Sequence, residues 1–82
     1  MFVDLLGKLD HPMKAELYRR HVSPGLIGDW KAGRRLPTEV QVAHLAAVTH
    51  SDWQELQREI TVLRAKPEER DEIAKAVGWR KR

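Results

Sequence analysis

Residues 21–37, HVSPGLIGDWKAGRRLP, contain the signals that decide the fold. The hydroxyl of Ser23 can cap the start of a helix, and Pro24 suits the first helical position, where a backbone N–H has no partner. Gly33 is typical of a helix end, because glycine readily adopts the left-handed conformation found there. The stretch therefore predicts one short helix over residues 24–33.

The two sides of this expected helix differ in chemistry. Ile27 and Trp30 lie three residues apart, so both fall on one face, which we expect to pack into the core. Directly after the helix come Arg34 and Arg35, and then a leucine and a proline that favour an extended chain. The helix thus combines an apolar inner face with a basic exit.

Two further helices are expected before this stretch. Residues 2–9 have apolar positions at helical spacing, and Asp10 is a candidate cap for the next helix, over residues 13–21. Val22 and Ser23 then make a tight turn into the third helix. The side chains expected to face inward on the second helix are Met13, Leu17 and Tyr18.

Two helices are expected after it. Thr38 and Gln41 form a capping-box pair at the start of the fourth helix, which ends near Thr49. Ser51 and Gln54 form a second capping-box pair at the start of the fifth. The side chains expected to face inward are Val42, Leu45, Ala46 and Val48 on the fourth helix, and Trp53, Leu56, Ile60 and Leu63 on the fifth.

A sixth short helix is expected near the end of the chain. Pro67 marks its start, Glu68 and Glu69 suit the positive end of its dipole, and Gly78 is its stop. No stretch has the alternation of a β-strand. The pattern predicts an all-α fold, a compact bundle of five to six short helices with a central helix-turn-helix.

Length and composition narrow the choice of function. The chain has 82 residues, 41% of them hydrophobic and 33% charged, which suits one small globular domain without room for a deep active site. It has no cysteine, so disulfides and thiolate metal sites are excluded. The longest apolar run, residues 42–48, is too short to span a membrane, and no export signal is visible. We expect a cytoplasmic protein.

The chain lacks the residue patterns of familiar catalytic and metal sites. Its only serines suit helix caps, and no glycine-rich phosphate loop is present. Glu55 and Glu59 lie opposite the apolar face of the fifth helix and are expected to be solvated. No pair of histidines has the i,i+4 spacing that would direct two imidazoles at one metal. We therefore expect no enzyme activity, no cofactor and no metal.

The distribution of charge suits a nucleic-acid partner without requiring one. The net charge is +3 and the sequence pI is about 9.6. Residues 31–35 carry three cations, Lys31, Arg34 and Arg35, and no acid. Residues 68–72, in contrast, hold four acids around one arginine. A basic patch therefore follows the third helix, and an acidic one opens the sixth.

Residues 13 to about 56 resemble the helix-turn-helix family of phage repressors and Cro proteins. The likeness is sharpest at IGDWKAGRRLP, residues 27–37, which is similar to that family's exit from the recognition helix, hydrophobic-x-x-Trp-x-x-Gly-Arg-x-x-Pro. The remaining C-terminal part is similar in layout to small phage and prophage regulators of the filamentous-phage type. The resemblance implies a regulator that places residues 24–33 in the major groove of double-stranded DNA.

The likeness has two departures in the second helix and the turn. Tyr18 occupies a position where the family usually has a small residue. His21 and Val22 stand where the family usually has a glycine, and the turn is one residue short. A different crossing angle between the two helices is therefore expected.

The side chains expected to face the DNA groove offer little direct base recognition. None can make a bidentate contact to a purine. Asp29 can accept from a cytosine amino group, Leu26 can touch a thymine methyl, and DNA shape is the alternative source of readout. Gly28 allows either close approach to DNA or close packing with another helix. The groove-facing set comprises Pro24, Gly25, Gly28 and Asp29, next to Ser23.

Four cations are candidates for contacts with DNA phosphates. Lys31, Arg34 and Arg35 lie at the end of the recognition helix, and Lys14 lies near the start of the second helix. Ordinary surface solubility is the alternative for the arginine pair and for Lys14. Two more arginines, at 19 and 20, can serve either DNA or the acids of the last helix.

Two questions about partners stay open at the sequence level. A small helical protein-binding module, such as a phage-encoded inhibitor or antitoxin, is the alternative to a DNA-binding regulator, with Trp53 and Trp79 as candidate anchors. Residues 1–66 are expected to form the DNA-binding domain and residues 67–82 a dimerisation element. In that homodimer the acids of residues 68–72 would pair with Arg58 and Arg64; the alternative is that the fifth helix packs only on its own domain.

Overall fold

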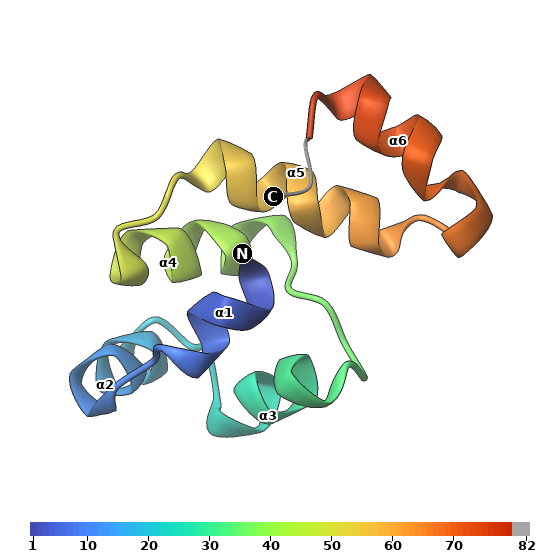
Figure 1. Ribbon diagram of the computed structural model, residues 1–82. Helices are drawn as coiled ribbons and strands as arrows, with labels where there is room; N and C mark the ends of the chain where they lie inside the picture. Colours follow the sequence, from blue (N-terminus) through green and yellow to red (C-terminus); the bar gives the residue numbers. More distant parts are fainter. Residues whose placement is uncertain (80–82) are drawn as a thin grey trace.

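The computed structural model describes residues 1–79, and within them the chain is helical without a strand. The all-α prediction is confirmed. The helices are short, and a 3₁₀ turn, η1, precedes the last of them (Figure 1). Their bounds are α1 Phe2–Gly7, α2 His11–Arg19, α3 Pro24–Ala32, α4 Glu39–Thr49, α5 Trp53–Arg64, η1 Pro67–Glu69 and α6 Arg70–Val77.

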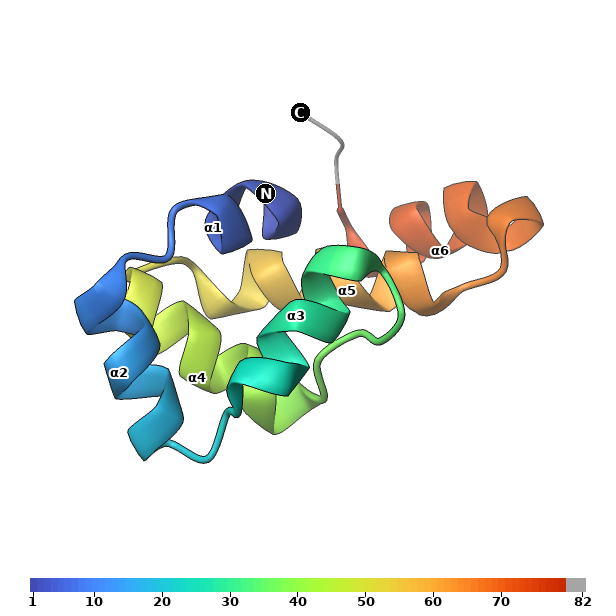
Figure 2. The ribbon, with the colours of Figure 1, turned by 90° about the horizontal axis from the view of Figure 1, so that it is seen from below.

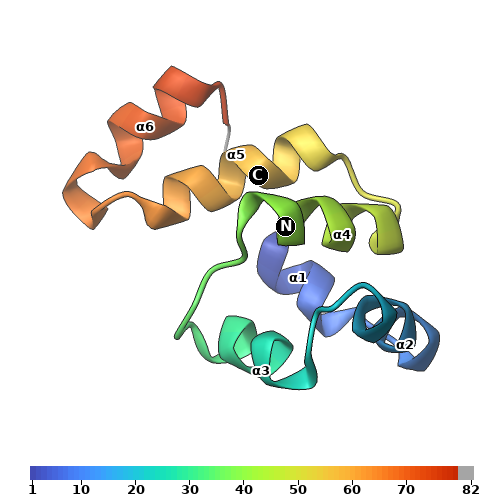
Figure 3. The same cartoon turned by 180° about the vertical axis from the view of Figure 1, so that it is seen from behind.

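The helices α4 and α5 lie side by side, and α1, α2 and α6 pack on this pair (Figure 1). Helix α2 packs on α4, while α1 lies between α3 and α5 and contacts both. Helix α6 packs on α5 and stands away from α2 and α3 (Figures 1 and 3). Within residues 1–79, no helix combines the length and apolar character needed to cross a bilayer.

The core forms where α1 to α5 meet. Leu17, Leu45, Leu56 and Ile60 are fully buried, and the ring centroids of Phe2 and Trp30, also in the core, lie 6.3 Å apart. The four residues expected to face inward on α4 are all buried. Removal of this apolar surface from water is the main driving force for folding.

Local capping signals explain most helix starts. The side chains of Asp10, Ser23 and Thr38 accept the backbone N–H groups expected of N-caps, and Gln41 completes the capping box with Thr38. At the other ends, the two predicted stops, Gly33 and Gly78, have φ of +75° and +73°. These positive φ values are readily adopted by glycine and rarely by other residues.

The predicted capping box of α5 is wrong by one residue. Asp52, not Ser51, is the N-cap, and its carboxylate accepts the backbone N–H of Glu55 at 3.1 Å. The hydroxyl of Ser51 lies 2.8 Å from that of Thr49 instead. Both side chains can cap a helix, so the sequence alone did not decide between the two neighbours.

Two aromatic residues expected to face inward are exposed. Tyr18 is 42% exposed because it is adjacent to Leu17, and neighbouring residues on a helix point about 100° apart. Trp53 is 40% exposed because it stands in the first turn of α5, at the margin of the core. Helical spacing therefore predicted the centre of each apolar face and failed at its edges.

Glu59 is buried, which contradicts the prediction that it is solvated. Its residue exposure is 7%, and its two carboxylate oxygens accept the backbone N–H of Phe2 at 3.1 and 3.2 Å. Helix α1 has no side-chain cap of its own, so Glu59 supplies one from α5. Glu55, expected to be solvated with it, is half-buried. A negative charge at a helix start also interacts favourably with the helix dipole.

The turn between α2 and α3 contains no glycine. His21 adopts the left-handed conformation with φ of +67°. The N–H of Val22 donates to the carbonyl of Leu17 at 2.9 Å, and the N–H of His21 donates to that of Tyr18 at 3.2 Å. These two bonds form a Schellman motif, which ends α2 and turns the chain into α3.

Candidate nucleic-acid interface

Helix α3 has a buried face and an exposed face. Ile27 and Trp30 point into the core with exposures of 4% and 3%, as predicted. Asp29 is half-buried between the two faces. The exposed face carries little besides small residues and one cation, in chain order Pro24, Gly25, Gly28, Lys31 and Ala32. Most of this surface is therefore close to the helix backbone itself.

The two glycines of this face are not required by the fold. A Cβ atom at Gly28 would meet no atom within 4 Å, and one at Gly25 would lie 3.8 Å from the Ser23 hydroxyl, an ordinary contact. Packing against another helix of the described chain therefore does not explain Gly28. Glycine inside a helix costs about 0.5–1 kcal/mol relative to alanine. At position 28, no close contact of the glycine within the described chain compensates for this loss of stability.

Arg34 and Arg35 both turn toward the carboxylate of Asp29. The Nε of Arg34 donates to Oδ1 of Asp29 at 2.9 Å, and the Nε of Arg35 lies 3.8 Å from Oδ2. The Arg34 backbone N–H also donates to the Asp29 carbonyl at 2.9 Å. One acid therefore holds both arginines at the end of α3.

This contact changes the expectation for Asp29. A base approaching α3 would share that carboxylate with Arg34, so direct readout of cytosine by Asp29 competes with an existing hydrogen bond. The arginine side chains are still 67% and 69% exposed, which leaves much of each guanidinium facing solvent. With Lys31 beside them, three cations and one carboxylate leave an excess of two positive charges at this end of α3.

The other two predicted site residues lie apart from the arginine pair. Ser23 is exposed, and its hydroxyl accepts the backbone N–H of Leu26 at 3.2 Å, which is its capping role. Lys14 is half-buried on α2. In the described part of the chain, no side-chain hydrogen bond or ion pair connects Lys14 with α3.

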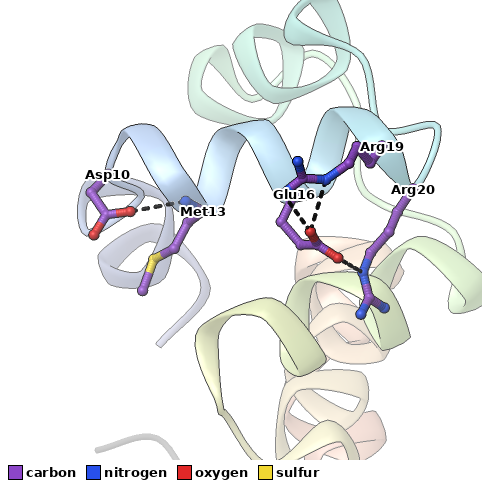
Figure 4. A network of polar contacts seen from close by, with 5 residues as sticks. All are labelled: Asp10, Met13, Glu16, Arg19 and Arg20. Atoms are coloured by element: carbon purple, nitrogen blue, oxygen red, sulfur yellow. Dashed lines mark hydrogen bonds and ion pairs between the residues drawn. The ribbon is translucent and has the colours of Figure 1, made fainter.

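Arg19 and Arg20 form a polar network with Glu16 on their own helix (Figure 4). Arg19 lies 2.8 Å and Arg20 3.2 Å from the Glu16 carboxylate. Hydrogen bonds from Arg19 and then Arg20 lower the pKa of Glu16. Arg20 also lies 3.4 Å from the ring of His44 on α4. Two roles were open for these arginines. Their acidic partner is Glu16 and not an acid of the last helix, while contact with DNA stays a prediction.

Long-range contacts of two further arginines position the loop after α3 and the end of α5. An Nη of Arg64 donates to the carbonyl of the buried Pro37, which ties that loop to α5. Arg70 lies over the last turn of α5 and donates to the carbonyls of Leu63 and Ala65. Sequence reasoning assigned Arg64 to a partner's acids, because nothing local connects it with a proline 27 residues away.

No cluster of three His, Asp or Glu side chains in residues 1–79 is arranged to hold a metal ion. Comparisons with protein-family models, curated proteins and solved structures give no match to this chain. The resemblance to phage repressors and Cro proteins stays a prediction from sequence. The surface of α3 and the arginines that follow it are the features of the described chain that indicate a function.

Proposed function

We propose that this protein binds double-stranded DNA through α3 and the arginines after it, and that it regulates transcription as a phage-type repressor in the cytoplasm of a bacterial host. The observation that carries the proposal is the exposed, side-chain-poor face of α3, which leads directly into two largely exposed arginines.

The dimensions of α3 suit the major groove. An α-helix with its side chains is about 10–12 Å in diameter, and the major groove of B-DNA is about 12 Å wide and admits one α-helix. The nine residues of α3 give it a length of roughly 13 Å. On the exposed face, only Lys31 has a long side chain. The backbone of Gly25 and Gly28 can therefore come close to the edges of the bases.

Affinity would come mainly from phosphates. Arginine and lysine neutralise phosphate charges and release counterions, which makes binding strongly dependent on salt. The side chains of Arg34 and Arg35 are 67% and 69% exposed, so both guanidinium groups remain accessible to phosphates while they lie beside Asp29. Sequence preference would then come largely from DNA shape and deformability, since the α3 face lacks a side chain for bidentate purine contacts.

Replacement of both arginines tests the proposal. Arg34→Ala/Arg35→Ala should weaken binding to every duplex and reduce the salt slope by about one to two units, because each lost phosphate contact removes about one unit. Fluorescence polarisation against phage and host promoter fragments at two salt concentrations measures both quantities. The matched control, Arg58→Ala/Lys66→Ala, removes the same charge from α5 and the loop after it. Equal effects of the two double variants, or none, would place the interface elsewhere.

A protein-binding module is the second candidate function. The observation that favours it is Trp53, whose side chain is 40% exposed in the first turn of α5. Exposed tryptophans often anchor protein interfaces. The same polarisation experiment separates the two candidates, since a module of this kind would bind no duplex even at low salt.

A further inference from the structure

A groove of about 990 Å³ lies between α1 and α6, over α5. Figure 2 shows α1 and α6 at separate positions along α5. Residues of all three helices line the groove. Its apolar lining includes Leu5 of α1, Leu63 of α5, and Ala74 and Trp79 from the C-terminal part of the chain. None of the residues that line the groove belongs to α3.

Helix α6 is covered on one side only. It has no buried residue, and it packs on α5 while its other side faces solvent. Its apolar side chains, Ile73, Ala74 and Val77, are each only half-buried. The helix therefore leaves apolar surface available beside the groove, and this surface continues into the groove through Ala74.

The charges of α6 are arranged to complement a second copy of the same helix. Asp71 stands in its first turn and Lys75 in its last, four residues apart, and both are exposed and line the groove. Within residues 1–79, neither side chain forms an ion pair. Two antiparallel copies of α6 would set each acid opposite the other copy's base.

We propose that the groove receives α6 of a second copy, so that the protein forms a two-fold dimer through α6 and the groove between α1 and α6. A two-fold interface uses the same patch on both subunits, and this patch must complement itself. An axis near Ile73 and Ala74 pairs Asp71 with Lys75 of the second copy, and Lys75 with its Asp71. The small side chain of Ala74 lets the two helices approach closely.

A second copy fits this groove better than a partner of one charge. The lining carries both signs, with Asp4 and Asp71 among the acids and Lys8 and Lys75 among the bases. A strongly acidic or basic peptide would meet like charges at half of these positions, which costs free energy. The inference rests on the proposed function in one respect: a dimer that binds two half-sites has to present its two copies of α3 one helical turn of DNA apart, about 34–36 Å.

Charge reversal tests the interface without DNA. Analytical ultracentrifugation should show the full chain as a dimer at about 50 μM. Asp71→Lys or Lys75→Asp alone places like charges opposite one another twice in a two-fold contact, and should weaken self-association at least about tenfold. The combined variant, Asp71→Lys/Lys75→Asp, restores opposite charges and should recover association to within about threefold of the original. Circular dichroism confirms that each variant is folded.

A second pair of variants probes the close approach of the helices. Ala74→Glu places a charged side chain between the two copies and should abolish dimerisation, whereas Ala76→Glu, on the same helix but outside the groove lining, should not. A monomeric full chain at that concentration, single reversals without effect, or a combined variant that fails to recover would overturn the proposal. These results leave the DNA proposal untouched, because the Arg34 and Arg35 variants test it separately.

Discussion

Gly28 and Asp29 are neighbours on α3 with opposite relations to the rest of the chain. Asp29 is held in contacts with two arginines, while a Cβ atom at Gly28 would touch nothing within 4 Å. An alanine at position 28 would therefore improve helix propensity without disturbing any neighbour. That the chain has glycine there is consistent with a surface that a large partner approaches closely.

Gly28→Ala should separate stability from DNA binding. We expect the free energy of unfolding to rise by about 0.5–1 kcal/mol, because alanine is the better helix former. We expect affinity for duplex DNA to fall about tenfold, or about 1.4 kcal/mol, because the added methyl group holds the backbone away from the bases. Urea unfolding and polarisation titrations measure the two effects.

Gly7→Ala is the matched control for that variant. Gly7 lies in α1, is exposed, and also has no atom within 4 Å of a built Cβ. This change should leave DNA affinity unaltered. If Gly28→Ala binds DNA as tightly as the unmodified protein, close approach at Gly28 is not part of binding.

At the scale of elements, the features that depend on residues close together in the chain could be predicted from the sequence. The helix over residues 24–33 was predictable because Ser23 and Gly33 act within a few positions of the groups they cap. The burial of Glu59 was not, because its partner Phe2 lies 57 positions away and only the folded chain brings them together. The contacts of Asp29 with the two arginines are intermediate between the local cap and the long-range bond. Their spacing in the sequence allowed these contacts, but the charges alone did not predict them.

Helix α3 should depend on Trp30 for its attachment. The side chain is 3% exposed and packs near Phe2 of α1, so Trp30→Ala would leave a large cavity between α3 and α1. We expect a loss of roughly 3–5 kcal/mol of unfolding free energy, which is a large part of what a small domain has. Trp53→Ala, at an exposed tryptophan of α5, should cost far less. Chemical unfolding monitored by circular dichroism measures the loss of unfolding free energy in each variant. Similar losses in Trp30→Ala and Trp53→Ala would contradict the role of Trp30.

At the scale of the whole molecule, the part of the proposed dimer surface that lies on α6 is separate from the core. Within residues 1–79, no member of the buried core lies after Val62, and α6 packs on α5 from outside. The proposed DNA-binding surface belongs to α3, which contacts α1. Removal of the C-terminal segment should therefore affect assembly far more than folding.

A chain that ends after Lys66 tests this separation. It loses the Arg70 contacts to the Leu63 and Ala65 carbonyls and the cover on one side of α5, so a lower melting temperature is expected while the helical core persists. Light scattering should show a monomer. Affinity for a two-site operator should fall at least about tenfold, because two linked copies of α3 bind with a higher effective concentration than one. Binding to a fragment with a single half-site should change much less. A truncated chain that still dimerises would place the subunit interface on α1 to α5, and one that unfolds would show that α6 contributes to the core.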